Sequence, residues 1–305
     1  MAGKIRKHFT DDQIIKTLDE YEGSLVQASR KLSQIGGVNV SCPVLCQWAN
    51  QLGYKFFKKT EPKILLFDIE TTPLKAYAWG LFNQNISINQ IIEDWKMICW
   101  SAKWLGDKKI INANIGKTDE FNVVADLWDL LDQADYVVAH NGDRFDVKKM
   151  NAKFLEFGLG NPSYYKTVDT LKIAKGNLSL TSNKLDWIAK ALDCDRKIKT
   201  DFNLWERCMN GDISGIDEMQ RYCDQDVMVL EEVYRQIRYL DKRTPHMSVY
   251  TENAVCNGCG SENIYHTGEH ITSGGVYQVY QCVDCSHNTK IKGNVLPNKN
   301  RGVSV

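Results

Sequence analysis

The chain has 305 residues, of which 43% are hydrophobic and 25% are charged, a composition typical of globular proteins. Basic and acidic side chains each number 38, so the net charge of zero points to no particular partner. No apolar run approaches the roughly 20 residues that span a bilayer, and the N-terminus lacks the apolar segment of a signal peptide. We therefore expect a cytoplasmic protein that does not bind membranes.

The charges are distributed unevenly along the chain. Residues 1–62 carry nine basic and six acidic side chains, and residues 286–305 carry four basic and no acidic ones. Basic ends can contact phosphates, whereas the more acidic middle can bind cations. This distribution favours nucleic acid as a partner.

Residues 10–53 predict three short helices, each preceded by a candidate N-cap: Thr10, Ser24 and Ser41. Three helices with a small core and basic surroundings resemble a helix-turn-helix module. Its third helix would offer Gln47 and Asn50 to base edges in the major groove. We assign residues 1–58 to this DNA-binding domain, and a small helical interaction domain is the alternative.

Residues 63–72 contain four consecutive apolar residues followed by two acids, Asp68 and Glu70. The apolar run predicts a short strand that is buried on both faces. Alternate residues of a strand point to the same side, so we expect the two carboxylates about 7 Å apart on one face. A divalent cation would stabilise such a pair, because hard cations take oxygen ligands.

The following segment alternates between strand and helix signals. Residues 97–104 and 109–115 predict two strands that form a hairpin. A helix is predicted next at 121–132, and a strand at 135–140. Further helices are predicted to begin near residues 145, 170, 182, 202 and 214. This order predicts an α/β fold, in which helices flank a mixed sheet.

Several aromatic residues follow the first strand: Tyr77, Trp79, Phe82, Trp100 and Trp104. They could stack on terminal bases or pack in the core. We expect core packing for most of them and leave Trp79 open.

Two later segments carry further acids. After the strand at 135–140, Gly142 allows a tight turn and Asp146 enters the first turn of a helix, where the helix dipole alone would favour an acid. In the last long helix, Tyr222 and Asp226 are four residues apart and share one face. Asp224 points away from that face and is expected to be a solvated acid.

Three segments resemble the exonuclease motifs of the DEDD superfamily: Phe67-Asp68-Ile69-Glu70-Thr71, Asn141…Phe145-Asp146 and Tyr222-x-x-x-Asp226. That superfamily comprises 3′–5′ exonucleases with a ribonuclease H-like fold, including proofreading domains of DNA polymerases. A tyrosine four residues before the last acid is typical of the DEDDy branch. The resemblance covers about residues 63–240, and we assign residues 63–241 to this domain.

The resemblance implies phosphodiester hydrolysis with two Mg²⁺ or Mn²⁺ ions. Asp68, Glu70 and Asp226 would hold one ion, Asp68 and Asp146 would hold the second, and Tyr222 would orient the attacking water. Phe145 is expected to pack, and Asn141 to brace either the turn or the terminal nucleotide. His140, which precedes the motif, is expected to be structural.

Two Cys-x-x-Cys pairs, 22 residues apart, flank an alternating strand signal at 276–280: Cys256, Cys259, Cys282 and Cys285. They resemble a zinc ribbon, in which four thiolates bind one structural Zn²⁺. Disulfides are the alternative, which a reducing compartment disfavours. We assign residues 250–292 to the ribbon and 293–305 to a basic flexible tail, and we expect the other six cysteines to be packing thiols.

These features together predict a metal-dependent 3′–5′ exonuclease, with DNA preferred over RNA and with replication or repair proteins as candidate partners. A 3′–5′ exoribonuclease and a DNA-binding regulator with an inactive nuclease fold are the alternatives. The complete set of acids argues against the inactive regulator, and the tyrosine motif disfavours an integrase or resolvase.

Overall fold

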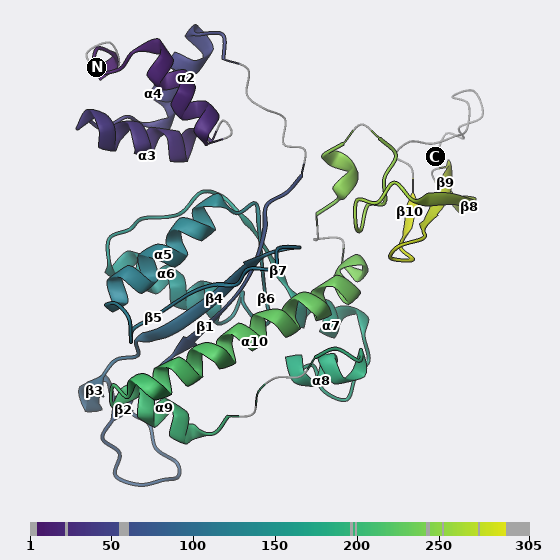
Figure 1. Cartoon of the computed structure of the whole chain (residues 1–305). Helices are drawn as coiled ribbons and strands as arrows, with labels where there is room; N and C mark the ends of the chain where they lie inside the picture. The colour runs from purple at the N-terminus through teal and green to yellow at the C-terminus, as the bar shows by residue number, and fades with distance from the viewer. Residues whose placement is uncertain are drawn as a thin grey trace. The chain divides into compact units, whose positions relative to one another are not determined.

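The computed structural model describes residues 5–21, 24–54, 61–195, 198, 200–241, 245–251, 253–273 and 275–290. The chain forms two compact units, residues 1–60 and residues 61–305 (Figure 1). The basic tail predicted at 293–305 lies outside the described residues. None of the helices in those ranges combines the length and the apolar character needed to cross a membrane.

The first unit contains the three predicted helices, α2 (Asp11–Glu20), α3 (Leu25–Gly36) and α4 (Cys42–Gln51). Thr10 forms a capping box with Gln13, so the first amides of α2 are satisfied. A small core joins the helices through residues such as Ile14, Leu32 and Trp48. Gln47 and Asn50 lie on the exposed surface of α4.

The second unit is built on a five-stranded sheet in the order β5-β4-β1-β6-β7. Its strands are β1 (Ile64–Thr71), β4 (Met97–Trp104), β5 (Ile111–Asn114), β6 (Tyr136–Ala139) and β7 (Lys166–Asp169). β1 pairs antiparallel with β4 and parallel with β6, which confirms the predicted mixed sheet. β7 was not predicted, because its four residues (Lys-Thr-Val-Asp) contain no apolar run.

Six helices flank this sheet: α5 (Glu120–Gln133), α6 (Asp146–Glu156), α7 (Thr170–Asn177), α8 (Leu185–Ala191), α9 (Phe202–Met209) and α10 (Ile213–Ile237). α5 and α6 cover one face, and α7, α8 and α10 cover the other (Figure 1). Leu65, Phe67 and Ile69 of β1 pack against the first group, and Ile64 and Leu66 pack against the second. The next residues of this second series are Asp68 and Glu70, so both acids lie on the α10 face.

The remaining elements are short. β2 (Lys75–Ala76) pairs with β3 (Ile91–Glu93), and the 3₁₀ helix η1 (Ile88–Gln90) precedes β3. Two more 3₁₀ turns, η2 (Arg238–Leu240) and η3 (Met247–Val249), follow α10. A separate antiparallel sheet is formed by β8 (Ile264–Thr272), β9 (Gly275–Cys282) and β10 (Asn288–Lys290).

A buried carboxylate joins α10 to the β4–β5 hairpin. Glu231 accepts hydrogen bonds from the Lys103 ammonium, from the Gly106 amide at 3.2 Å and from Arg235 Nε at 2.9 Å. Burial alone would raise the pKa of Glu231, but the hydrogen bonds from Lys103, Arg235 and Gly106 outweigh it and hold this pKa below its ordinary value of 4.5. The charged form of Glu231 therefore stabilises the folded chain.

Replacement of Lys103 by methionine should lower the free energy of unfolding at pH 7 by about 1–3 kcal/mol, because Glu231 loses a buried charged partner. The loss should shrink as the pH falls below 4.5 and through the depressed pKa, since protonation of Glu231 removes the same interaction from the wild type. Urea unfolding followed by tryptophan fluorescence at several pH values measures both effects.

Lys172→Met is the matched control. Lys172 pairs with Asp143 at 2.6 Å, but 48% of its side chain is exposed, so its removal should change stability by less than about 1 kcal/mol. Equal losses for the two variants would contradict the role assigned to Glu231.

Candidate active site and cysteine cluster

Three carboxylates converge where β1 lies under α10. Asp68 and Glu70 come from β1 and Asp226 comes from α10, and one oxygen of each lies within 4.8 Å of the other two. Asp226 is buried, and the two strand acids are half-buried. Three carboxylates at this spacing repel one another unless a cation lies among them, and they offer the oxygen ligands that Mg²⁺ and Mn²⁺ prefer.

Asp146, the fourth predicted acid, approaches the same part of β1 from the side of β6, which precedes α6 in the chain. β1 pairs with β6 only as far as Leu66, so the Ile69 amide is available to a side chain. Asp146 begins α6, is 3% exposed and accepts a hydrogen bond from the Ile69 amide at 3.4 Å. The structure therefore places Asp146 beside the backbone between Asp68 and Glu70, outside the group of three oxygens.

The turn from β6 to α6 fixes Asp146. Asn141 adopts the left-handed conformation, with φ 67°, and its amide donates to Asp169 Oδ1 at 2.9 Å. Asp169 also caps α7 with its side chain. Gly142 allows this tight turn, as expected, because a Cβ there would lie 2.5 Å from Ala139 Cβ. The close approach of the two backbones excludes a side chain, and the positive φ belongs to Asn141.

His140 supports the same turn. Its Nδ1 lies 2.9 Å from Thr170 Oγ1, and its Nε2 lies 3.0 Å from the Asn183 carbonyl. Because both ring nitrogens contact residues that follow β7, His140 joins the turn to the neighbouring helices. This agrees with the structural role expected for it.

The prediction that Asp224 is a solvated acid was wrong. Its carboxylate accepts hydrogen bonds from Ser101 Oγ at 2.6 Å, Asn112 Nδ2 at 3.0 Å and Gln220 Nε2 at 3.2 Å. These donors belong to β4, β5 and α10, so Asp224 fixes the helix across the antiparallel half of the sheet. The spacing within α10 could not reveal them, because two of the donors are more than 100 residues away in the chain.

Two cysteines pack beneath the acids. Cys223 Sγ lies 3.4 Å from the Asp68 carbonyl, and Cys99 lies beside it on β4. Burial, with contributions from Cys99 and the two strand acids, raises the pKa of the Cys223 thiol well above its ordinary value of 9.0. Both residues are therefore neutral packing thiols, as predicted.

A cavity of about 1000 Å³ adjoins the acids, and every acidic motif contributes to its wall. Thr71 and Thr72 follow Glu70, Phe145 precedes Asp146, and Tyr222 lies one turn before Asp226. The Tyr222 ring contacts Trp205 of α9 edge-on, with 6.4 Å between the ring centroids. Phe145 was expected to pack, but it is 40% exposed at this wall.

Lys149 is a cavity residue that the sequence interpretation missed. Its ammonium lies 3.6 Å from the centre of the Trp95 ring, which also lines the cavity. Burial lowers the pKa of Lys149 from its ordinary value of 10.5, and nearby Asp94 opposes this shift. Lys149 is three residues after Asp146, so helical spacing could have placed both on one face of α6. No spacing in the sequence indicated that Trp95 would lie beside Lys149.

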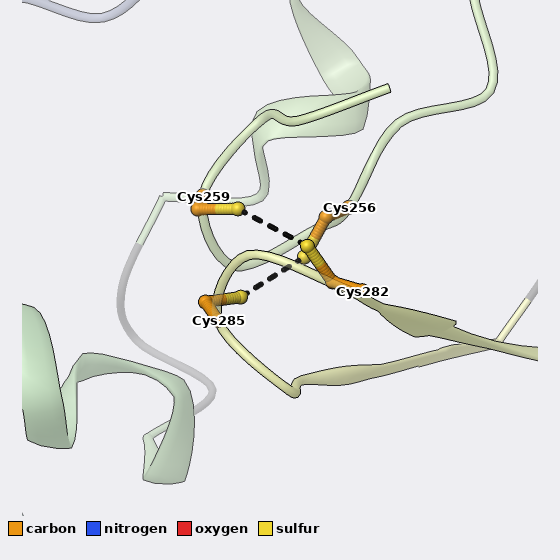
Figure 2. A group of neighbouring side chains, drawn as sticks. All are labelled: Cys256, Cys259, Cys282 and Cys285. Atoms are coloured by element: carbon orange, nitrogen blue, oxygen red, sulfur yellow. Dashed lines mark hydrogen bonds between the residues drawn. The ribbon is translucent and has the colours of Figure 1, made fainter. Parts of the chain in front are cut away.

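The four cysteines of the C-terminal pairs lie together (Figure 2). Cys256 Sγ is 3.6 Å from Cys285 Sγ, and Cys259 Sγ is 3.6 Å from Cys282 Sγ. Four thiolates in a tetrahedron at 2.3 Å from a zinc ion would be about 3.8 Å apart, so the observed spacing fits this metal. All ten cysteines of the chain are free thiols, which contradicts the disulfide alternative.

Residues 65–238 match the family described as the RNase_H superfamily. The DNA polymerase III PolC-type of Ureaplasma parvum serovar 3 is 27% identical over 194 residues, which cover 57% of this chain and 11% of that polymerase. This chain therefore corresponds to only a small part of its curated relative.

Among solved structures, the family B DNA polymerase from the archaeon Pyrobaculum calidifontis is similar at 15% identity and a TM-score of 0.44. That match covers 59% of this chain and 25% of the polymerase. The family match covers more than half of the 305 residues and includes all three acidic motifs. The chain belongs to the RNase H superfamily.

Proposed function

We propose that this protein is a metal-dependent 3′–5′ exonuclease of the DEDDy type, with DNA as its preferred substrate. The observation that carries the proposal is the convergence of Asp68, Glu70 and Asp226, with the Asp146 carboxylate bonded to the backbone between the first two. Residues next to these acids in the chain line a cavity. The similarity to a stretch of PolC-type DNA polymerase III supports action on DNA.

The acids would hold the catalytic ions in two groups. Asp68, Glu70 and Asp226 would hold one Mg²⁺ or Mn²⁺, and Asp68 and Asp146 would hold the second. When bound, such a pair supplies an activated water and neutralises charge on the phosphoryl oxygens. Water then replaces the 3′ oxygen of the preceding nucleotide on phosphorus, which releases a nucleoside 5′-monophosphate and leaves a new 3′ hydroxyl.

The cavity residues would position the terminal nucleotide. Tyr222 is one helical turn from Asp226, where its hydroxyl can orient the attacking water. Phe145, Trp205 and Trp95 offer aromatic surface to a base or sugar, and Lys149 offers a cation to a phosphate.

The other parts of the chain would supply binding and stability. We propose that residues 1–58 form a DNA-binding domain that uses the exposed Gln47 and Asn50 of α4. Residues 63–241 would form the nuclease domain. Residues 250–292 would form a ribbon around one structural Zn²⁺, followed by a basic tail at 293–305.

End-labelled single- and double-stranded DNA and RNA test the activity. With Mg²⁺ we expect stepwise shortening from the 3′ end, fastest on DNA, and complete loss in EDTA. Asp226→Asn keeps the shape of the side chain but removes its charge, and should lower the rate by more than about a hundredfold.

Asp126→Asn is the control, because Asp126 is an exposed acid of α5 on the opposite face of the sheet. Shortening from the 5′ end, activity in EDTA, or equal activity of the Asp226 variant would contradict the mechanism. Faster degradation of RNA would favour the exoribonuclease alternative.

Lys149→Met should raise KM for a single-stranded oligonucleotide by about tenfold, because one charged contact to a phosphate is lost. The slope of log Kd against log salt concentration should fall by about 0.7, the value for one phosphate contact on a single strand. Steady-state kinetics and titrations at several salt concentrations measure these changes.

Lys148→Met is the matched control, since Lys148 is the exposed neighbour of Lys149 on α6. An unchanged KM and salt slope in the Lys149 variant would show that this lysine serves only to pack against Trp95.

Elemental analysis of the purified chain should give one zinc per molecule. Cys259→Ser removes one of the four converging thiolates and should lower the zinc content strongly, whereas Cys194→Ser, outside the cluster, should leave it unchanged. A wild-type protein without zinc would contradict the ribbon assignment.

A further inference from the structure

Residues 77–90 form a projecting loop, to which we refer as the arm. Its base is closed by the β2–β3 pair and by two hydrogen bonds of 2.9 Å, from the Tyr77 amide to the Gln90 carbonyl and from Gln90 Nε2 to the Tyr77 carbonyl. Ser87 and Gln90 add a capping box around η1. The arm therefore has a defined base, and Figure 1 shows it extending away from the sheet where β2, β3 and α9 lie.

The arm exposes large apolar side chains that a folded chain normally buries. Trp79 is 96% exposed, Leu81 93%, Phe82 83% and Tyr77 72%. The expectation of core packing was therefore wrong for Tyr77 and Phe82 but right for Trp100, which is 1% exposed. Contiguous exposed apolar residues are characteristic of binding surfaces.

Both ends of the arm lead directly to the cavity beside the acids. On the N-terminal side, β1 continues through Thr72 and Leu74, which line the cavity, into β2. On the C-terminal side, β3 is followed by Trp95, which lines the same cavity. Residues on both sides of the arm's base therefore form part of the cavity wall.

We propose that the arm binds the single-stranded segment of nucleic acid next to the terminal nucleotide, by stacking bases on Trp79 and Phe82. This inference rests on the proposed function, and it adds a surface outside the cavity that binds the strand leading to the terminal nucleotide. Every base has an aromatic face, so stacking tolerates sequence, and a duplex hides those faces. Residues 76–92 contain no charged side chain, so the arm recognises bases rather than phosphates.

The test is the affinity of the full chain for fluorescein-labelled oligothymidylate in EDTA, measured by anisotropy. The double variant Trp79→Ala/Phe82→Ala should bind the single strand about tenfold to a hundredfold more weakly, the scale of one or two lost stacking contacts. Its salt slope should match the wild type, because stacking releases no counterions. Affinity for a blunt duplex should be unchanged.

Tyr164→Ala is the matched control. Tyr164 is 92% exposed and precedes β7. Because β1, β6 and β7 are parallel, Tyr164 lies at the end of the sheet opposite the C-terminal ends of these strands, where the acids are found. Unchanged single-strand affinity in the double variant, or an equal loss in Tyr164→Ala, would overturn the proposal. Unchanged affinity would point to a protein as the ligand of the arm.

A minimal substrate separates this inference from the proposed function. The p-nitrophenyl ester of thymidine 5′-monophosphate has no adjoining strand for the arm to bind, so the double variant should hydrolyse it with Mn²⁺ at the wild-type rate, and Asp226→Asn should not. If no protein hydrolyses it while the double variant still loses single-strand affinity, the catalytic proposal fails and the binding proposal stands.

Discussion

Mutual repulsion among carboxylates is the constraint around which the second unit is organised. Asp68, Glu70 and Asp226 place oxygens within 4.8 Å of one another, and two of them belong to a strand whereas the third belongs to a helix. Repulsion would separate β1 from α10 unless other contacts held them together. Those contacts lie on both sides of the acids. Asp224 and Glu231 bond α10 to the β4–β5 hairpin, and the apolar core of Leu66, Val227 and Leu230 binds it to β1.

The same elements build the acidic site and the cavity wall. Each motif contributes an acid and, within four residues of it, a wall residue: Thr71 beside Glu70, Phe145 beside Asp146 and Tyr222 before Asp226. A shift of β1, α6 or α10 would therefore move the acids and the cavity wall together. For the proposed hydrolysis this linkage would favour productive geometry, since reacting atoms and catalytic groups must be aligned closely.

Different surfaces of the second unit offer different kinds of contact. The carboxylates attract cations, Lys149 offers a positive charge inside the cavity, and the arm offers uncharged aromatic surface outside it. A nucleic acid presents phosphates and base faces, which match the lysine and the arm respectively. Stacking on the arm, as proposed, would need no specific base and would therefore suit an exonuclease that acts on successive nucleotides of a shortening strand.

The sequence alone predicted what depends on local pattern. The run Ile64–Phe67 predicted a buried strand, its alternation placed Asp68 and Glu70 on one face, helical spacing paired Tyr222 with Asp226, and the cysteine spacing predicted a cluster of four. Other features depended on residues distant in the chain. The donors to Asp224, the contact of Ile69 with Asp146 and the ring of Trp95 over Lys149 arise only when the elements pack. Tertiary structure also decided that Tyr77 and Phe82 face solvent, because apolar character favours burial but the fold determines whether a loop has a core to enter.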